Sequence, residues 1–153
     1  GTWAMARWPS CRKAETMTSD VKVPSPEAHD LSAPWWEGTK RGAFVVQKCS
    51  DCGTLRHYAQ ELCTACHSFA HDWVELSGRG KVHSWTVTHH AFHPAFAGAL
   101  PYALVTLDMD EGVRAMGRLA GMEPSALQIG LRLRASFPLA GDGFGRLTFV
   151  PEA

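Results

Sequence analysis

Residues 49–66 have the sequence CSDCGTLRHYAQELCTAC, and this stretch decides the fold. It contains two Cys-x-x-Cys pairs, Cys49 with Cys52 and Cys63 with Cys66. Two residues between cysteines let one tight turn direct both sulfur atoms at a single point, and a short hairpin brings the two turns together. Four converging thiolates are the ligand set of tetrahedral zinc. The spacing therefore predicts one structural zinc ion bound by these four cysteines.

Two other interpretations of the cysteine pairs remain open. An iron ion in a rubredoxin-like site would use the same four ligands. A redox dithiol would need only one pair, usually at a helix start beside a βαβ unit, and the sequence suggests no such unit. Because four sulfurs leave no open coordination position, we expect no catalysis at the metal. We expect the ion to stabilise a module of about 37 residues, which is too small to bury a sufficient core.

Downstream of the cysteines, five short segments alternate apolar and polar residues. In one of them Ala103, Val105, Leu107 and Met109 share a face, which is typical of a half-buried antiparallel strand. The segments are residues 81–89, 102–109, 113–120, 131–137 and 146–150, with a helical stretch at 123–130. Five strands with a helical link between the third and the fourth predict a small Greek-key barrel of the OB type.

Upstream of the cysteines, residues 27–38 indicate a short helical segment, with Pro34 in its first turn and Gly38 at its end. The predicted fold is therefore mostly β, a rubredoxin-like zinc ribbon followed by a five-stranded OB-type barrel. We divide the chain into a flexible N-terminal arm, a short helical segment, a zinc ribbon and an OB-fold barrel, at residues 1–26, 27–41, 42–78 and 79–153. Cys11 lies in the arm and is expected to be a free thiol.

The composition gives no general attraction to nucleic acid or to an anionic membrane. Lysine plus arginine and aspartate plus glutamate are 15 each, so the formal net charge is zero. No apolar run approaches the roughly 18 residues that a membrane span needs. The start of the sequence lacks the apolar region of a signal peptide. With cysteines arranged for a metal, these features favour a cytoplasmic protein.

The segment from His89 to Tyr102, HHAFHPAFAGALPY, is a candidate binding surface. It joins the first two predicted barrel strands and carries Phe92, His93 and Phe96 in addition to Tyr102. An apolar loop of this length is unusual on the surface of a globular protein. It either folds over an open end of the barrel or meets a ligand or partner, and we favour the second interpretation.

Trp35 and Trp36 are further candidates for a partner contact. Adjacent residues cannot share one face of a helix. One tryptophan can therefore pack inward while the other meets a second surface, or both can cover the core of the chain itself. The sequence does not decide between these alternatives.

No catalytic constellation is apparent. His89, His90 and His93 are close in sequence, but His89 and His90 would point to opposite faces of a strand, so we expect no second metal site. No histidine stands beside an evident nucleophile or orienting carboxylate, and no G-x-S-x-G, Walker or Rossmann motif is present. The sequence therefore predicts no catalytic residue, although an independent enzyme remains a weaker alternative.

The order of these features resembles a known family. A short aromatic helix precedes a four-cysteine ribbon, and Trp73 and the turn S-G-R-G at 77–80 follow it. Further on come an HP…PY loop, the motif L-D-x-x-E-G-V at 107–113, and the Ile129-Gly130 pair. Over residues 28–151 the chain resembles the zinc-ribbon plus OB-fold proteins called domain-of-unknown-function family 35. Thr64 stands where the family commonly has proline, but all four metal ligands are intact.

The resemblance implies a non-catalytic accessory subunit of a thiolase-superfamily acyl-CoA enzyme. Such partners include thiolases, acyltransferases and aldolases, some acting in steroid side-chain degradation, and they carry the catalytic residues. This chain would support assembly and the binding of the CoA thioester. Arg114 and Arg118 could contact the CoA phosphates, although a solvated outer face is the simpler interpretation.

Nucleic-acid binding is the alternative function, because zinc ribbons and OB folds both serve it. The predicted barrel, however, carries seven basic and six acidic residues from position 79 onward, which does not suggest a basic groove.

Overall fold

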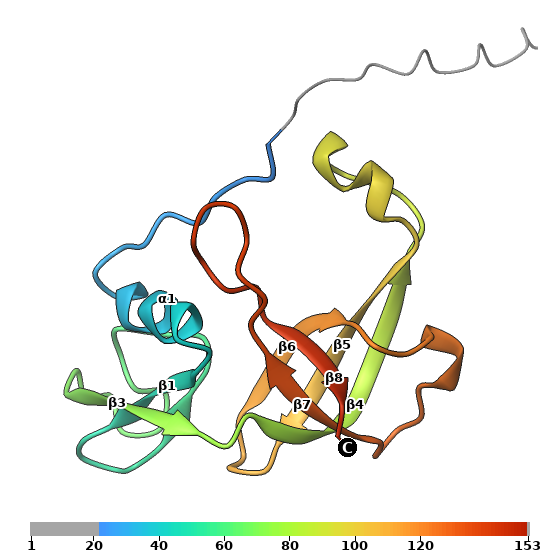
Figure 1. Cartoon of the computed structure of the whole chain (residues 1–153). Helices are drawn as coiled ribbons and strands as arrows, with labels where there is room; N and C mark the ends of the chain where they lie inside the picture. Colours follow the sequence, from blue (N-terminus) through green and yellow to red (C-terminus); the bar gives the residue numbers. More distant parts are fainter. Residues whose placement is uncertain (1–21, 153) are drawn as a thin grey trace, which may run out of the picture.

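The computed structural model of the chain describes residues 22–152 and contains one short helix, a three-stranded sheet and a five-stranded barrel (Figure 1). This confirms the predicted mostly β fold class. Residues 22–29 have no regular secondary structure. Cys11 and residues 1–21 of the predicted arm lie outside the described residues. No helix within residues 22–152 has the length and apolar composition that crossing a bilayer requires.

Helix α1 spans Ala33–Lys40 and has a proline in its first turn, as Pro34 predicts. The expected end at Gly38 is wrong, because the helix continues to Lys40. Gly38 is instead a point of close packing, since a β-carbon there would lie 2.7 Å from Cγ2 of Val45. The absence of a side chain, and not helix termination, is what this position requires.

The cysteine module forms an antiparallel sheet of order β2-β1-β3. Strands β1 (Phe44–Cys49) and β2 (Leu55–Arg56) lie on either side of the first cysteine pair, although β2 is shorter than predicted. Strand β3 (His71–Leu76) was not predicted. Its residues lack clear alternation, and pairing with all six residues of β1 determines its conformation.

The barrel is closed in the order β4-β5-β6-β8-β7, which confirms the predicted architecture (Figure 1). Strands β6 and β8 are parallel, and the other pairs are antiparallel. The strands are β4 (Arg79–Thr88), β5 (Tyr102–Met109), β6 (Arg114–Leu119), β7 (Arg132–Ser136) and β8 (Thr148–Pro151). Two 3-10 helices, η1 (Pro94–Ala99) and η2 (Pro124–Ala126), lie in the loop after β4 and in the link after β6.

One hydrophobic core joins the barrel to the ribbon. Leu107, Leu133 and Phe149 fill the barrel and are fully buried. Phe44 and Val46 of β1 belong to the same buried cluster. The ribbon sheet therefore does not rest on the barrel as a separate body but contributes apolar side chains to its core.

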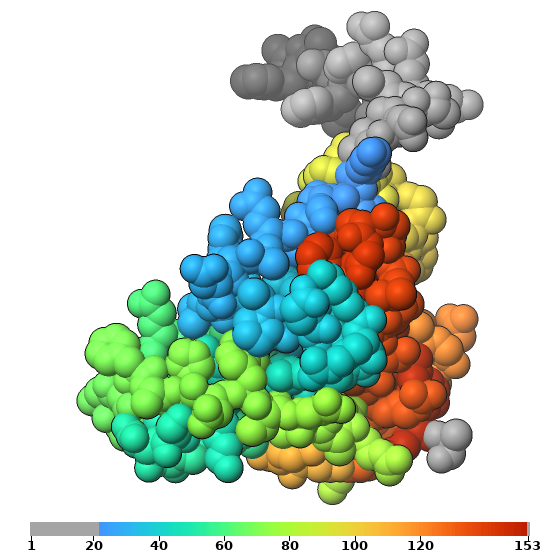
Figure 2. All heavy atoms as spheres, turned by 60° about the vertical axis from the view of Figure 1, so that its left-hand side comes forward, coloured from blue at the N-terminus to red at the C-terminus, as the bar shows by residue number. Residues whose placement is uncertain are grey.

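Helix α1 strengthens this junction from the outside. The ring of Trp35 lies 5.3 Å from that of Phe44 and 5.9 Å from that of Phe137, and Trp36 lies 5.6 Å from Phe144. Figure 2 shows the helix pressed between the ribbon and the segment that follows β7. Both tryptophans thus contact residues of the chain itself.

Four charged side chains tie the turn after β5 to the end of β8. The guanidinium of Arg132 donates to both carboxylate oxygens of Asp110, at 2.5 and 2.8 Å, and from Nε to Glu152 at 2.9 Å. Arg79 also lies 3.3 Å from Glu152. The hydrogen bonds from Arg132 hold the pKa of Asp110 and of Glu152 below their usual range.

We expect Gly145→Ala to destabilise the protein by about 1–3 kcal/mol through overpacking. A β-carbon at residue 145 would collide with the backbone carbonyl oxygen of Thr39, and the helix would have to move to relieve it. Gly141→Ala is the matched control, since a β-carbon there meets nothing within 4 Å. Urea unfolding of both variants measures the difference. Equal stability of the two would contradict the close packing of α1 on this loop.

We expect Arg132→Met to flatten the acid dependence of stability. Because Asp110 and Glu152 have lowered folded pKa values, their contribution is present above their unfolded values and is lost as the pH falls below about 5. The variant lacks this contribution, so its free energy of unfolding should fall less steeply. Acid also weakens zinc binding in both variants. The control Arg134→Met shares this effect, so a difference in pH dependence between the two variants reflects the Arg132 network. If Arg132→Met kept the steep wild-type dependence of the free energy of unfolding on pH, the Arg132 network would be excluded as the source of that dependence.

Candidate metal centre and exposed hairpin

The two cysteine pairs adopt the same backbone turn. In the first, the amide of Gly53 donates to the carbonyl of Cys49 at 2.9 Å, and in the second the amide of His67 donates to that of Cys63 at 2.9 Å. Gly53 and His67 both have positive φ, 75° and 61°. Glycine at this place was expected, whereas the left-handed backbone of His67 has no sequence signal. The repeated turn directs the sulfurs of both pairs toward one point.

The four sulfur atoms lie within 4.8 Å of one another. The Sγ atoms of Cys49 and Cys66 are 3.6 Å apart, as are those of Cys52 and Cys63. Tetrahedral coordination at about 2.3 Å places sulfurs about 3.8 Å apart, so the ligand set fits zinc. Cys49 and Cys63 are buried, and Cys52 and Cys66 are exposed. The cofactor of this chain is one structural zinc ion.

The surroundings of the sulfurs lower the thiol pKa of two ligands, Cys52 and Cys63, the latter through the backbone amides of Cys66 and Ala65. For Cys66, the backbone hydrogen bond of Ser68 is outweighed by the hydrogen bond with Cys52 and by burial, which raise the thiol pKa. Hydrogen bonds from the side chain and backbone of Thr54 lower the pKa of the Cys52 thiol to about 6. A thiol must lose its proton to bind a metal, so a low pKa assists binding at neutral pH. Because sulfur fills all four coordination positions, the ion has no open position for a substrate, and its role is to stabilise the fold.

A second feature is the long β4–β5 hairpin, whose loop projects away from the barrel (Figure 1). Residues 84–107 contain no Asp, Glu, Lys or Arg. Phe92 at the tip is 91% exposed, and Trp85 on β4 is 38% exposed. Globular surfaces are normally rich in charge, so an uncharged projection of this length is characteristic of an interface.

The edge of β4 adds backbone groups to this surface. Its pairing with β7 covers only residues 79–81, and a further pair of hydrogen bonds joins Val82 to Gly130 and Leu131. Beyond Val82, the structure of residues 22–152 pairs β4 on one side only, with β5. Unpaired strand edges readily accept another chain.

Four of the predicted contact residues lie in this hairpin, and a fifth, Arg118 of β6, contacts it. His93 accepts a hydrogen bond from the Ala95 amide and begins η1, and its ring lies 6.0 Å from that of Phe96. Arg118 of β6 lies over the ring of Tyr102 at 4.9 Å and donates to the Ala99 carbonyl at 3.4 Å. Phe92 lies in the same loop, where its ring is 5.3 Å from that of His90.

The other three predicted contact residues lie elsewhere. Trp35 and Trp36 lie on α1 and pack as described above. Arg114 is at the opposite end of β6 from Arg118, where its Nε donates to Asp108 at 2.7 Å. His83 lies 2.9 Å from the other carboxylate oxygen of Asp108. The structure therefore does not unite the candidate residues into one site.

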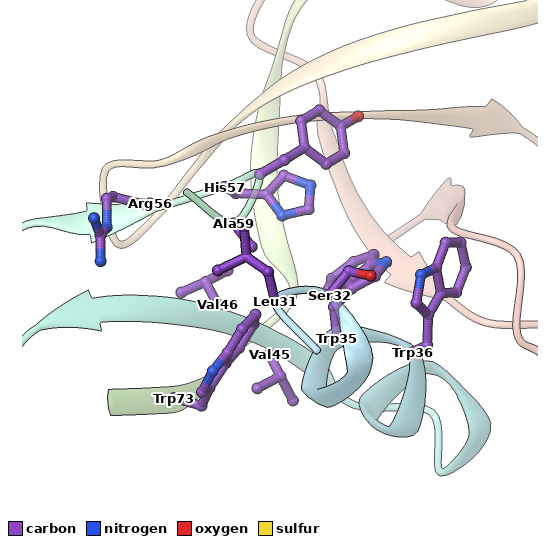
Figure 3. Close-up of a pocket in the computed structure, with 11 residues that line it drawn as sticks. Leu31, Ser32, Trp35, Trp36, Val45, Val46, Arg56, His57, Ala59 and Trp73 are labelled. Carbon is purple, nitrogen blue, oxygen red and sulfur yellow. The ribbon is translucent and has the colours of Figure 1, made fainter. Parts of the chain in front are cut away.

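A pocket beside the ribbon was not predicted. It lies between α1, β1, β3 and the connection after β2, and it contains Arg56 and His57 (Figure 3). No motif marks these two residues, because the pocket forms only when the helix and the connection fold over the sheet.

The fold and the metal centre define a zinc-ribbon protein with an OB-fold barrel. Family models described as "ChsH2, rubredoxin-like zinc ribbon domain" and "ChsH2, C-terminal OB-fold domain" match residues 36–72 and 73–138. The chain belongs to this family of ChsH2-like, or DUF35, proteins. The expected family resemblance is thereby confirmed.

Three relatives illustrate the similarity. A "Probable enoyl-CoA hydratase alpha subunit" of Thermomonospora curvata is 39% identical over 84% of this chain, which spans 40% of that protein. A "Benzoylsuccinyl-CoA thiolase subunit BbsA" of Geobacter metallireducens is 35% identical over 71% of this chain and 74% of its own length. A solved structure described as "Ltp2-ChsH2(DUF35) aldolase" is 35% identical, with a TM-score of 0.75 over 83% of this chain and 98% of the other.

We expect Cys63→Ser to lose bound zinc and solubility together. Structural zinc contributes about 10–16 kcal/mol in small peptides, far more than a ribbon of this size can replace by packing. Elemental analysis and circular dichroism of the purified variant measure both effects. Cys11→Ser, which changes the cysteine outside the ligand set, is the control and should keep its zinc. A well-folded, metal-free Cys63→Ser protein would contradict the structural role.

Proposed function

We propose that this chain is a non-catalytic accessory subunit, or the corresponding domain, of a thiolase-superfamily acyl-CoA enzyme complex. Its relatives named above are described as a thiolase subunit, a hydratase subunit and an aldolase complex. The partner carries the catalytic residues, and this chain supports its assembly and the binding of its CoA thioester.

The uncharged β4–β5 hairpin is the observation that carries this proposal. Cores of protein interfaces are depleted of charge and enriched in aromatic residues. Residues 84–107 have this composition, and Phe92 is almost fully exposed at the tip. We propose that Phe92, His93, Phe96 and Tyr102 contact the partner enzyme.

The arginines have different proposed roles. Arg118 is exposed beside the loop of the hairpin and contacts Tyr102 and Ala99. It is the better candidate for a CoA phosphate, because Arg114 already pairs with Asp108. Trp35 and Trp36 contribute mainly to the junction between helix and barrel, since both contact aromatic residues of this chain.

An independent catalytic role receives no support from the histidine and carboxylate pairs that the structure describes. His83 and Asp108 form an exposed pair, and the second oxygen of Asp108 binds Arg114. Such a surface network excludes no water and positions no nucleophile. We therefore assign the chemistry to the partner.

Nucleic-acid binding also lacks its main requirement. Binding of single strands combines stacking aromatics with a basic groove. Residues 84–107 of the hairpin supply aromatic rings but no lysine or arginine, and Arg132 of β7 and Arg146 before β8 are ion-paired. Beside this segment Arg118 offers one phosphate contact, whereas affinity for nucleic acid depends on several such contacts.

We also propose a cytoplasmic location. The four described cysteines are free thiols placed for metal binding, which suits a reducing compartment better than an oxidising one.

We expect Phe92→Glu to raise the Kd for the partner at least about 30-fold, or ~2 kcal/mol, since it buries an unpaired charge. The chain is first used as bait in lysate of its source organism, where a thiolase-like polypeptide should co-purify. Size-exclusion binding assays then compare Phe92→Glu with Ile129→Glu, which changes an apolar side chain that is 78% exposed on another loop. Capture of nucleic acid or nothing, or equal loss in both variants, would refute the proposal.

A further inference from the structure

The pocket beside the ribbon has apolar walls and a volume of about 210 Å³ (Figure 3). Three tryptophans supply much of the wall, two from α1 and one from β3. The lining residues are Leu31, Ser32, Trp35, Trp36, Val45, Val46, Arg56, His57, Tyr58, Ala59 and Trp73. None of them is acidic, so the pocket has no internal counter-ion for a cation.

Arg56 is the unusual member of this lining. It is only 6% exposed, and within residues 22–152 none of its three guanidinium nitrogens has a hydrogen-bond partner. Figure 3 shows its side chain directed from β2 toward β1. Buried arginines are almost always paired with an anion. Arg56 takes part in none of the ion pairs that the structure of residues 22–152 describes.

Neighbouring polar groups also lack partners among the described residues. Gln47 is the cross-strand neighbour of Arg56, and its Nε2 has no acceptor among the described residues. The Nε2 of His57 likewise has no partner there. Burial lowers the pKa of His57 to about 4, so this ring is neutral at pH 7. Arg56 is therefore the one charged residue of the lining.

We infer that this pocket is a binding site for a carboxylate carried on a small apolar or aromatic body, with the Arg56 guanidinium as its counter-ion. A guanidinium pairs with a planar carboxylate through two parallel hydrogen bonds. The apolar part of the ligand would lie against the tryptophans. Nothing assigned to the metal centre or the hairpin involves this site.

Charge and size exclude larger anionic ligands. A phosphate dianion would keep an uncompensated charge in an apolar pocket beside a single guanidinium. Pockets for drug-sized ligands have volumes of about 300–1,000 Å³, so this one is too small for a CoA thioester. It suits one acidic side chain of a docked protein or a small free acid.

The connection after β2 provides the way in. The guanidinium nitrogens are buried, so a ligand must displace part of what covers them, and the connection is the neighbouring segment of the lining. Tyr58 in the connection is 59% exposed. In residues 57–62, the described hydrogen bond to the sheet is from the Gln60 amide to Oε1 of Gln47, at 2.9 Å. The ring of His57 also packs on Trp35 and Phe44, so residues 58–62 are the lightly held part of the connection, which can move without unfolding the sheet.

Benzoate and its neutral isostere benzamide test the inference on the zinc-loaded full chain. In an NMR titration, we expect benzoate to shift the indole N–H resonances of the lining tryptophans until the shifts reach saturation. Benzamide should bind at least about tenfold more weakly, because it cannot form the ion pair. Arg56→Met should weaken benzoate binding by a similar factor, whereas the control Arg134→Met should not. Arg56→Lys keeps the charge without the planar fork and should give an intermediate affinity.

Equal binding of benzoate and benzamide to the wild-type chain would overturn the inference, and so would unchanged benzoate binding in Arg56→Met. The isostere comparison needs no variant, so misfolding of a variant leaves it decisive. Adding the co-purified partner then identifies the source of the carboxylate. Loss of benzoate binding in the complex indicates an acidic side chain of the partner, and retained binding indicates a free acid. The first measurements stand even if no partner is found.

Discussion

The convergence of four cysteine thiolates on one zinc ion is the interaction on which the rest of this structure depends. The ribbon has strands as short as β2, two residues long, and little core of its own. The metal holds the two turns together, and β1 is then fixed between its neighbours. Through Phe44 and Val46, the same strand supplies the barrel core. Folding of the ribbon and packing of the barrel are therefore coupled through one strand.

This coupling explains where the junction residues lie. Helix α1 presses Trp35 against Phe44 and Phe137, so a ring from the N-terminal side covers the seam between sheet and barrel. Gly38 lets α1 approach Val45 of the ribbon sheet, and Gly145 lets the segment after β7 approach Thr39 in α1. Such close contacts are sensitive to single methyl groups, since well-packed interiors tolerate overpacking poorly.

The two surfaces assigned here differ in kind. The hairpin is an exposed projection without charge, and its suitability for a protein partner follows from composition and exposure. The pocket at Arg56 is small, and its proposed specificity follows from one buried charge among apolar walls. A partner can therefore be recognised through an extended contact area at the hairpin and through a single carboxylate at the pocket.

The sequence by itself determined the metal ligands and the barrel strands, because both are encoded in short-range patterns: the x-x spacing of Cys49 with Cys52, and the two-residue alternation of Val105 and Leu107. Only the tertiary structure decided strand β3, the location of Gly38 within α1, and the pocket around Arg56. These features arise from contacts between segments that are distant in the chain. Local propensity and periodicity carry no record of such contacts, so folding alone brings Trp73 and Arg56 to the same cavity.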